Sequence, residues 1–393
     1  MITRFGVKNY KALRDISLDL TPLHALIGPN DSGKTSILEA LAALCKSVDS
    51  PLRQIFPAGT AFTELLWEGS LGGSVSIGCG VADGEFLGTY SFDCAPAAAA
   101  TTNLCAQQQT WTPDGKNPID LHPTAGLGST AVHWGTTMPH LSGTEKILAG
   151  NIRNALSGVA LFRWNASMLR LPVILEAQRR FTMDISGFGL AQCLDDILGL
   201  DREQFRQLEL KFCAIFPEVK SIQLVAEMAY QWPTQQTADG MPHLMTGSGK
   251  GISFQLRNGH SIRAAQASDG LLLTLAYLTL LFLPQPPRVI LVQEPENGIH
   301  PRRLQGVLKI LRQLLSEHSR TQILLTTHSP YLLDCFQPEE VTLCRKEPDG
   351  SVSVHPLQGM PEVRKQLAVF SLGEIWTAEG DDALAKSTNH GAT

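Results

Sequence analysis

The sequence predicts an α/β fold with a mixed or parallel core sheet, an antiparallel β lobe and a helical lobe. Three observations support this prediction. A glycine-rich loop, GPNDSGKT at residues 28–35, lies between an apolar strand pattern at 23–27 and a helix pattern at 36–44. Two later apolar strand patterns, at 289–296 and 323–329, each end in polar side chains. Strands that alternate with helices in this way are typical of a parallel sheet.

The glycine-rich loop is a candidate phosphate-binding site. A strand, a glycine loop and a helix in this order let backbone N–H groups surround the phosphates of a nucleotide. Lys34 can reach the β- and γ-phosphates, and the Thr35 hydroxyl can ligate Mg²⁺. The remaining candidate contacts to ATP are Asn30, Ser32, Gly33 and Ser36. The alternative is a plain glycine turn, but a chance match to the whole pattern is on the order of one in a hundred.

Composition favours a large enzyme of the cytoplasm. The 393 residues carry a net charge of −5, so no global basic field draws the chain to nucleic acid. The eight cysteines show no Cys-x-x-Cys spacing, which argues against a zinc site and a disulfide framework. No signal peptide is visible at the start, and the longest apolar stretch, Leu271 to Pro284, is too short to span a bilayer. We therefore expect reduced thiols and no membrane contact.

The first half of the chain is expected to hold the antiparallel lobe. Residues 1–22 have the pattern of two antiparallel strands, and residues 70–94 that of a hairpin around Ala82-Asp83-Gly84. Residues 95–143 show no period and are interpreted as a partly mobile surface insertion. A helix is expected from Thr144 to Leu161.

In the second half of the chain, the sequence pattern predicts helices at Asp201–Ile215 and Arg302–Leu315. It also predicts a late hairpin with strands at 341–344 and 351–355. A second glycine-rich run, residues 247–250, is rejected as a phosphate loop because no helix follows it. The pattern there predicts a hairpin with a type I′ turn at Asn258-Gly259.

The expected organisation is therefore an N-terminal part with the antiparallel lobe and the phosphate loop at 1–94, an insertion with a helical segment at 95–170, and a C-terminal part at 171–393.

Four further motifs, in this order along the chain, identify a family. They are Ser268-Asp269-Gly270 before a long apolar helix, Glu294-Pro295-Glu296-Asn297, His300-Pro301, and His328 after an apolar strand. With the phosphate loop and the opening residues 2–13, they resemble ABC-type ATPases, and more narrowly the RecF-like and OLD-like branch, which is AAA-type and SMC-related. The resemblance covers residues 1–45 and roughly 170–380. It implies the P-loop NTPase fold of an ABC-type ATPase head.

The resemblance also implies roles for these residues. Ser268 and Gly270 would hold the γ-phosphate bound by a second copy, so that ATP joins two heads in a dimer. Glu294 would orient or deprotonate the attacking water, and His328 would contact the γ-phosphate. Each motif also has a structural interpretation. Ser268 with Asp269 and Gly270 can be a helix N-cap, His328 a histidine at a strand end, and Glu296 a solvated acid at a helix start.

The metal site departs from the family pattern. The residue before the catalytic glutamate is usually Asp or Glu, whereas here it is Gln293. An amide can accept a hydrogen bond from metal-bound water but supplies no charge, so ATP hydrolysis to ADP and phosphate is expected to be slow. Gln178 is a second candidate contact to Mg²⁺.

The expected function is that of an ATP-dependent switch. The sequence shows neither long heptad arms nor a zinc hook, and about sixty-five residues follow His328, too few for the Toprim nuclease domain that ends OLD-type proteins. The resemblance thus implies a head that forms a homodimer or higher oligomer and controls a separate effector, a nuclease, in bacterial anti-phage defence. Two alternatives stay open: a RecF-like clamp on duplex DNA, using patches at Arg179-Arg180 and Arg302-Arg303, and an assembly scaffold with little turnover.

Overall fold

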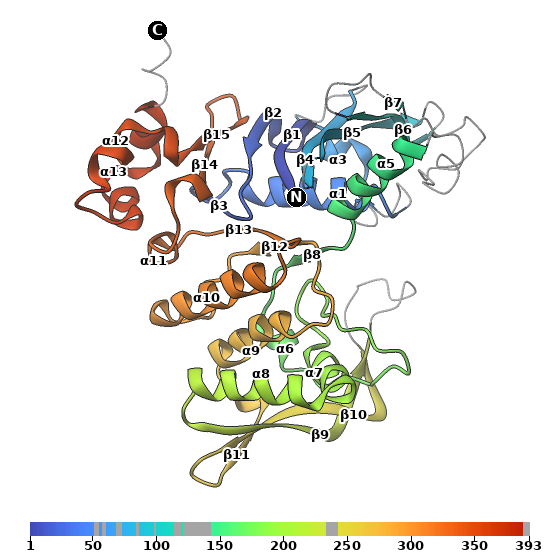
Figure 1. Ribbon diagram of the computed structural model, residues 1–393, viewed down its shortest axis with the longest axis vertical. Helices are drawn as coiled ribbons and strands as arrows, with labels where there is room; N and C mark the ends of the chain where they lie inside the picture. The colour runs from blue at the N-terminus through green and yellow to red at the C-terminus, as the bar shows by residue number, and fades with distance from the viewer. Residues whose placement is uncertain are drawn as a thin grey trace. The chain divides into compact units, whose positions relative to one another are not determined.

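The computed structural model describes residues 1–50, 55–56, 60–67, 73–83, 86–97, 100–113, 119–120, 143–232 and 243–387. The chain folds into two compact units (Figure 1). The first unit comprises residues 1–161, 287–292 and 319–393, and the second comprises 162–286 and 293–318. The division of the sequence at residues 94 and 170 stays a prediction.

An antiparallel sheet occupies the N-terminal part of the first unit, in the strand order β2-β1-β4-β5-β6-β7. Its strands are β1 (Ile2–Tyr10), β2 (Leu13–Asp19), β4 (Val75–Asp83), β5 (Phe86–Ala97), β6 (Ala100–Pro113) and β7 (Ile119–Asp120). The pairs β1–β2 and β4–β5 are both antiparallel. They confirm the two hairpins predicted for residues 1–22 and 70–94.

The prediction for residues 95–143 is wrong in part. Strand β6 pairs antiparallel with β5 and extends the sheet, and residues 98–99, 114–118 and 121–142 lie outside the described residues. Sheet pairing uses backbone groups that every residue except proline carries. A run of Ala, Thr and Gln can therefore form a strand without an apolar period.

The helix predicted from Thr144 to Leu161 also ends earlier than expected. Helix α5 covers Gly143–Leu156, and the last residues of the predicted helix belong to strand β8 (Val159–Phe162). Gly158, with φ +75°, separates the two elements, because this backbone conformation is not helical.

The core of the first unit contains a mixed sheet in the order β15-β14-β3-β13-β12-β8. Its other strands are β3 (Leu23–Ile27), β12 (Val289–Gln293), β13 (Gln322–Thr326), β14 (Val341–Lys346) and β15 (Val352–Pro356). Strand β3 is parallel to both β13 and β14. Every residue of β3 is buried, as expected for a strand inside a parallel sheet. The antiparallel pair β14–β15 confirms the late hairpin.

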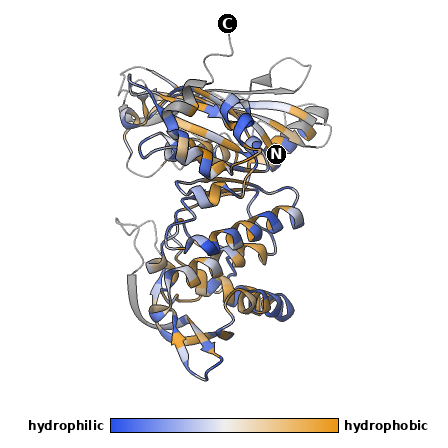
Figure 2. Cartoon of the chain, turned by 90° about the vertical axis from the view of Figure 1, so that its left-hand side faces the viewer, coloured by the Kyte–Doolittle hydropathy of each residue, from blue (hydrophilic) through white to orange (hydrophobic). Residues whose placement is uncertain are grey.

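Helix α1 (Lys34–Lys46) leaves the phosphate loop and enters the core of this unit. Its buried residues Ile37, Leu38 and Leu41 belong to one apolar cluster with residues of the antiparallel sheet and α5. Hydrophobic residues recur along the helices and strands of the molecule (Figure 2). The remaining helices of the unit are α3 (Phe62–Leu65), α11 (Pro330–Leu333), α12 (Pro361–Gln366) and α13 (Leu372–Ser387, with a kink at Gly380).

The second unit is built around helix α9 (Asp269–Leu281), in which every residue from Leu271 onward is buried. Four other helices belong to the unit: α6 (Ala166–Leu169), α7 (Leu190–Leu200), α8 (Arg202–Ile215) and α10 (Pro301–Glu317). Helix α9 contacts all four of them. Asp201 caps α8 through bonds to the N–H groups of Glu203 and Gln204. Helices α8 and α10 confirm the two predicted there.

A three-stranded sheet in the order β11-β10-β9 completes the second unit. It consists of β9 (Val219–Gln231), β10 (His243–Leu256) and β11 (Ser261–Arg263). Residues 247–250 lie inside β10, so their rejection as a phosphate loop is confirmed.

The type I′ turn predicted between β10 and β11 is wrong. Among the described residues only Gly259 of the Asn258-Gly259 pair has a positive φ. The Gly259 N–H donates to the carbonyl of Leu256 at 3.1 Å, and the Leu256 N–H donates to that of His260 at 2.8 Å. The loop is therefore one residue longer, a turn that ends in a left-handed glycine.

Candidate nucleotide-binding site

The phosphate loop connects β3 to α1 as the sequence predicts, and two glycines set its shape. Gly28 has φ +137°, and a Cβ added there would lie 2.1 Å from the carbonyl oxygen of Cys344. Gly33 has φ +82° and is the N-cap of α1, where no described side chain caps the helix. The N-terminus of a helix favours an anion.

Lys34 places a cation inside this loop. Its Nζ donates to the carbonyl of Gly28 at 2.9 Å, to that of Pro29 at 2.7 Å and to the Ser32 hydroxyl at 3.2 Å. The lysine and Ser32 are buried, whereas Asn30 and Thr35 are exposed and Ser36 is half-buried. A buried ammonium that bonds neutral oxygens of the loop is suited to phosphate oxygens. The loop therefore fits the phosphates of a nucleotide.

A second lysine at the loop was not found from the sequence. Lys346, the last residue of β14, forms an ion pair with Asp31, which has φ +65°. The two residues are 315 positions apart, so only the fold brings them together. This contact fastens the exposed part of the loop to the neighbouring strand.

His328 follows the strand next to β3. The parallel register pairs Thr326 with Leu26, and the Thr327 N–H donates to the carbonyl of Leu26 at 3.0 Å. The phosphate loop and His328 therefore leave neighbouring strands at the same edge of the sheet. Ligands of open α/β sheets bind at the carboxyl ends of the strands. His328 is half-buried there.

The acidic turn after β12 has an uncommon backbone. Gln293 is the last residue of the strand, and Glu294 has φ +48°. The Asn297 side-chain amide donates to the Glu294 carboxylate at 2.7 Å, and its backbone N–H donates to the carbonyl of Glu294 at 3.1 Å. Left-handed non-glycine residues cost free energy and gather at functional sites. Asn297 thus orients Glu294, a role that the sequence pattern did not indicate.

Ser268 begins helix α9 in the second unit. Its hydroxyl accepts a hydrogen bond from the Leu271 N–H at 3.4 Å, as the N-cap interpretation predicts. The Asp269 carboxylate accepts from Arg170 at 2.6 Å. A Cβ on Gly270 would lie 3.3 Å from the carbonyl oxygen of Gly298. Ser268-Asp269-Gly270, called the signature motif below, therefore packs directly against the acidic turn at residues 294–298.

Gln178 is exposed, and its role at the metal stays a prediction. Among the described residues no group of three or more His, Cys, Asp or Glu side chains gathers as a metal site. The described helices are all too short or too polar to cross a membrane.

The arginine patches considered for DNA contact make contacts within the second unit. The Arg180 guanidinium lies 4.6 Å from the ring centroid of Trp232 and bonds Glu176, and that of Arg303 lies 4.4 Å from the ring centroid of Phe216.

Comparison with known proteins agrees with this geometry. A family model described as "AAA ATPase domain" matches residues 1–67, and one described as "AAA domain, putative AbiEii toxin, Type IV TA system" matches residues 170–334. The chain is 24% identical over 374 residues to an "OLD nuclease" of Thermus scotoductus (strain ATCC 700910 / SA-01). This alignment covers 90% of the chain and 64% of the relative's length, so the chain spans less than two thirds of that protein.

Among solved structures, the chain is similar to an SMC head bound to the C-winged helix domain of ScpA. The TM-score is 0.54 at 13% sequence identity, and the match covers 90% of this chain and 96% of the other. At that identity the likeness shows the fold, which is that of an ABC-type ATPase head with a mixed sheet, an antiparallel sheet and a helical part.

Proposed function

Because the chain is an ABC-type ATPase head of the OLD-like family, we propose that it is a switch that dimerises around ATP and controls a nuclease effector in anti-phage defence. The observation that carries the proposal is the phosphate loop, in which a buried lysine bonds the loop and no side chain caps the helix that follows. The matched relative is a nuclease by its name, and the similar SMC head is bound to a domain of another protein. Both support an output through an effector.

The phosphate loop would hold the nucleotide. Lys34 would exchange its bonds to loop carbonyls for bonds to phosphate oxygens, and the N-terminal N–H groups of α1 would donate to the same group. The Thr35 hydroxyl and the Gln293 amide would contact Mg²⁺ or its water. Bound MgATP would supply the phosphoryl group that is transferred to water.

Hydrolysis would depend on Glu294 and His328. Asn297 holds the Glu294 carboxylate by a 2.7 Å hydrogen bond, which restricts its rotamers, and the carboxylate would accept a proton from water. His328 stands at the sheet edge from which the phosphate loop leaves and would donate to a phosphate oxygen. Because Gln293 supplies no charge to the metal, turnover would be slow.

Dimerisation would depend on Ser268 and Gly270. They start α9, a helix of 13 residues whose N-terminal dipole favours an anion. In a head-to-head pair, each signature motif would complete the phosphate site of the other copy. The state of the dimer, rather than the heat of hydrolysis, would be read by the effector.

The test combines two variants. Lys34→Ala should remove most ATP binding in calorimetry, because residues 28–35 contain no other cation to meet the phosphates. Ser268→Arg should keep ATP binding to the monomer but abolish the mass change that ATP induces in light scattering. Ser316→Arg, at an exposed position of α10, controls for the added charge. Normal ATP affinity in Lys34→Ala, or an unchanged ATP-induced mass in Ser268→Arg, would contradict the proposal.

A further inference from the structure

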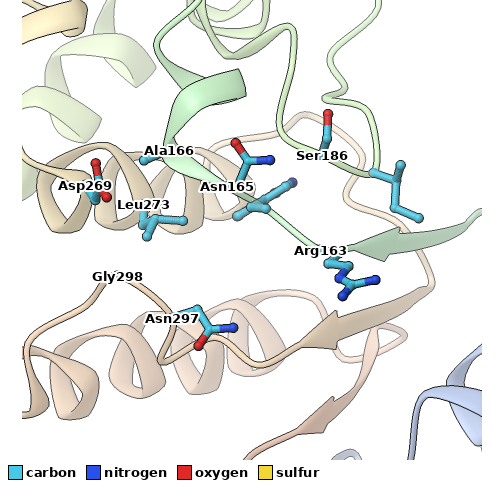
Figure 3. Close-up of a pocket in the computed structure, with 10 residues that line it drawn as sticks. Arg163, Asn165, Ala166, Ser186, Asp269, Leu273, Asn297 and Gly298 are labelled. Atoms are coloured by element: carbon cyan, nitrogen blue, oxygen red, sulfur yellow. The ribbon is translucent and has the colours of Figure 1, made fainter. Parts of the chain in front are cut away.

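The outer edge of β9 has no role in the proposed function. By contrast, the cavity beside the start of α9 (Figure 3) is lined by Asp269 and Gly298, which adjoin the Gly270 assigned to the partner's nucleotide. Strand β9 is the last strand in the order β11-β10-β9, so one side of it pairs with β10 and the other side is an edge. An edge strand presents backbone N–H and C=O groups that can pair with another strand.

The direction of the backbone groups along this edge follows from a contact with α8. The Ile222 N–H donates to the Glu209 carboxylate of that helix at 2.7 Å, so it points away from β10. The register with β10 is unbroken across the following residues. Because the direction alternates along an antiparallel strand, Leu224, Ala226 and Met228 also direct their N–H and C=O groups outward.

The edge is covered at both ends and open between them. At one end, α8 covers it through the bond of Glu209. At the other end, the Tyr230 N–H donates to the carbonyl of Pro172 at 3.0 Å, and the Ile174 N–H donates to the carbonyl of Tyr230 at 2.9 Å. For residues 224–228, the described part of the chain supplies no partner to the outward backbone groups. These groups are therefore available to a strand from outside the chain.

The side chains at the three outward positions are apolar. Ala226 is exposed, Met228 is 60% exposed and Leu224 is half-buried. They lie on the same face of the sheet as the buried Ile222, so they continue the apolar face to the edge. Glu227 lies on the other face and forms an ion pair within its own sheet. Edges of monomeric proteins are usually protected by lysine or proline, and the sequence has neither at these three positions.

We propose that residues 224–228 pair antiparallel with the same segment of a second copy of this chain. Ala226 lies on the two-fold axis opposite the partner's Ala226, and Leu224 lies opposite the partner's Met228. Each pair exchanges N–H···O bonds in both directions. In this register every open position meets an open position. A register centred on another residue would set an open position against one that its own chain already covers.

The composition of the segment suits such a symmetric contact. The small side chain of Ala226 on the axis allows the usual spacing of paired strands, about 4.8 Å. Leu224 and the partner's Met228 form an apolar cross-strand pair on one face. On the other face Glu227 lies opposite the partner's Val225, so no like charges meet. Isologous two-fold contacts of this kind are the commonest in homodimers.

The contact joins two three-stranded sheets into one continuous sheet. Because the open segment is short, the buried area falls below the ~1,200 Å² of a standard interface, and we expect a dissociation constant in the micromolar range. The contact uses neither the phosphate loop nor the signature motif, so it needs no nucleotide. Together with the proposed ATP dimer, it would link heads into larger assemblies.

The test is sedimentation velocity of the full chain without nucleotide, over about a hundredfold range of concentration around the micromolar range. The wild type should pass from monomer to dimer. Ala226→Glu and Ala226→Arg each place two like charges on the axis and should raise the dissociation constant at least about tenfold. An equimolar mixture of the two variants should recover the dimer, because Glu then lies opposite Arg. Ala265→Glu and Ala265→Arg, at an exposed position after β11, should dimerise as the wild type does.

Circular dichroism and urea denaturation check that each variant is folded. Should either Ala226 variant unfold, Met228→Lys takes its place, because Met228 is largely exposed and a lysine there faces the partner's Leu224. The proposal is overturned if the wild type stays monomeric throughout, if folded edge variants dimerise as the wild type does, or if the mixture stays monomeric. The ATP-induced change in mass is measured at lower concentration, where the β9 pair is dissociated, so failure of either dimer leaves the test of the other intact.

Discussion

Replacing Gly28 with alanine should damage both the fold and nucleotide binding. The residue has φ +137°, which L side chains rarely adopt, and strain of this kind costs about 1–3 kcal/mol. The new Cβ would lie 2.1 Å from the Cys344 carbonyl oxygen, a backbone atom of β14, so one of the two segments must move by more than an ångström. We expect the free energy of unfolding to fall by about 3 kcal/mol and ATP affinity to fall with it.

The assay is urea denaturation followed by circular dichroism, with ATP affinity measured by calorimetry. Gly150→Ala is the matched control, because Gly150 lies in α5 of the same unit and a Cβ there meets nothing within 4 Å. That change should stabilise by up to about 1 kcal/mol. If Gly28→Ala unfolds within about 0.5 kcal/mol of the wild type, the close approach of loop and β14 is wrong.

Two further predictions concern the metal and a buried histidine. Gln293→Asp should raise ATP turnover, most at low Mg²⁺, while Glu294→Gln should lower it by ~10²–10⁴-fold; equal phosphate release at every Mg²⁺ level would remove Gln293 from the metal site. Burial lowers the pKa of His24 from 6.5 to about 4, so the unfolded chain takes up a proton first as pH falls. The stabilisation by neutral His24 is complete above pH 6.5 and is lost towards pH 4, by about 3 kcal/mol at most. His24→Gln should make the urea concentration at the midpoint of unfolding depend less on pH between pH 7 and 4.5. An unchanged pH dependence in this variant would show that His24 does not titrate there.

The features predicted best from the sequence were those in which a local pattern and a chemical requirement coincide. The loop at 28–35 needs glycines for its backbone and a lysine for its charge, and both stand in one short segment. Helix α9 could be predicted because the apolar run that begins at Leu271 is too long for a strand. The structure places both as the sequence predicts.

The features missed depend on contacts between distant residues or on backbone torsions. Lys346 reaches Asp31 only because β14 lies beside β3. The Asn258-Gly259 pair is compatible with a two-residue loop and with a loop one residue longer. The pairing of β10 with β11 selects the longer loop. Strand β6 was missed because its sequence has no apolar alternation, whereas its pairing with β5 is made by backbone groups. In each case the deciding interaction lies outside the window that a sequence pattern covers.

Within the second unit, the groups proposed to bind the partner's nucleotide and the proposed catalytic glutamate, Glu294, belong to one packed arrangement. Gly270 of the signature lies against the carbonyl of Gly298, and its neighbour Asn297 bonds the carboxylate of Glu294. Glu294 keeps φ +48° only while this turn holds its shape, because the isolated residue would relax to a common conformation. A contact that moves the start of α9 would therefore move the turn that orients Glu294. Under the proposed function, closure of the dimer would act on Glu294 directly through this packing contact.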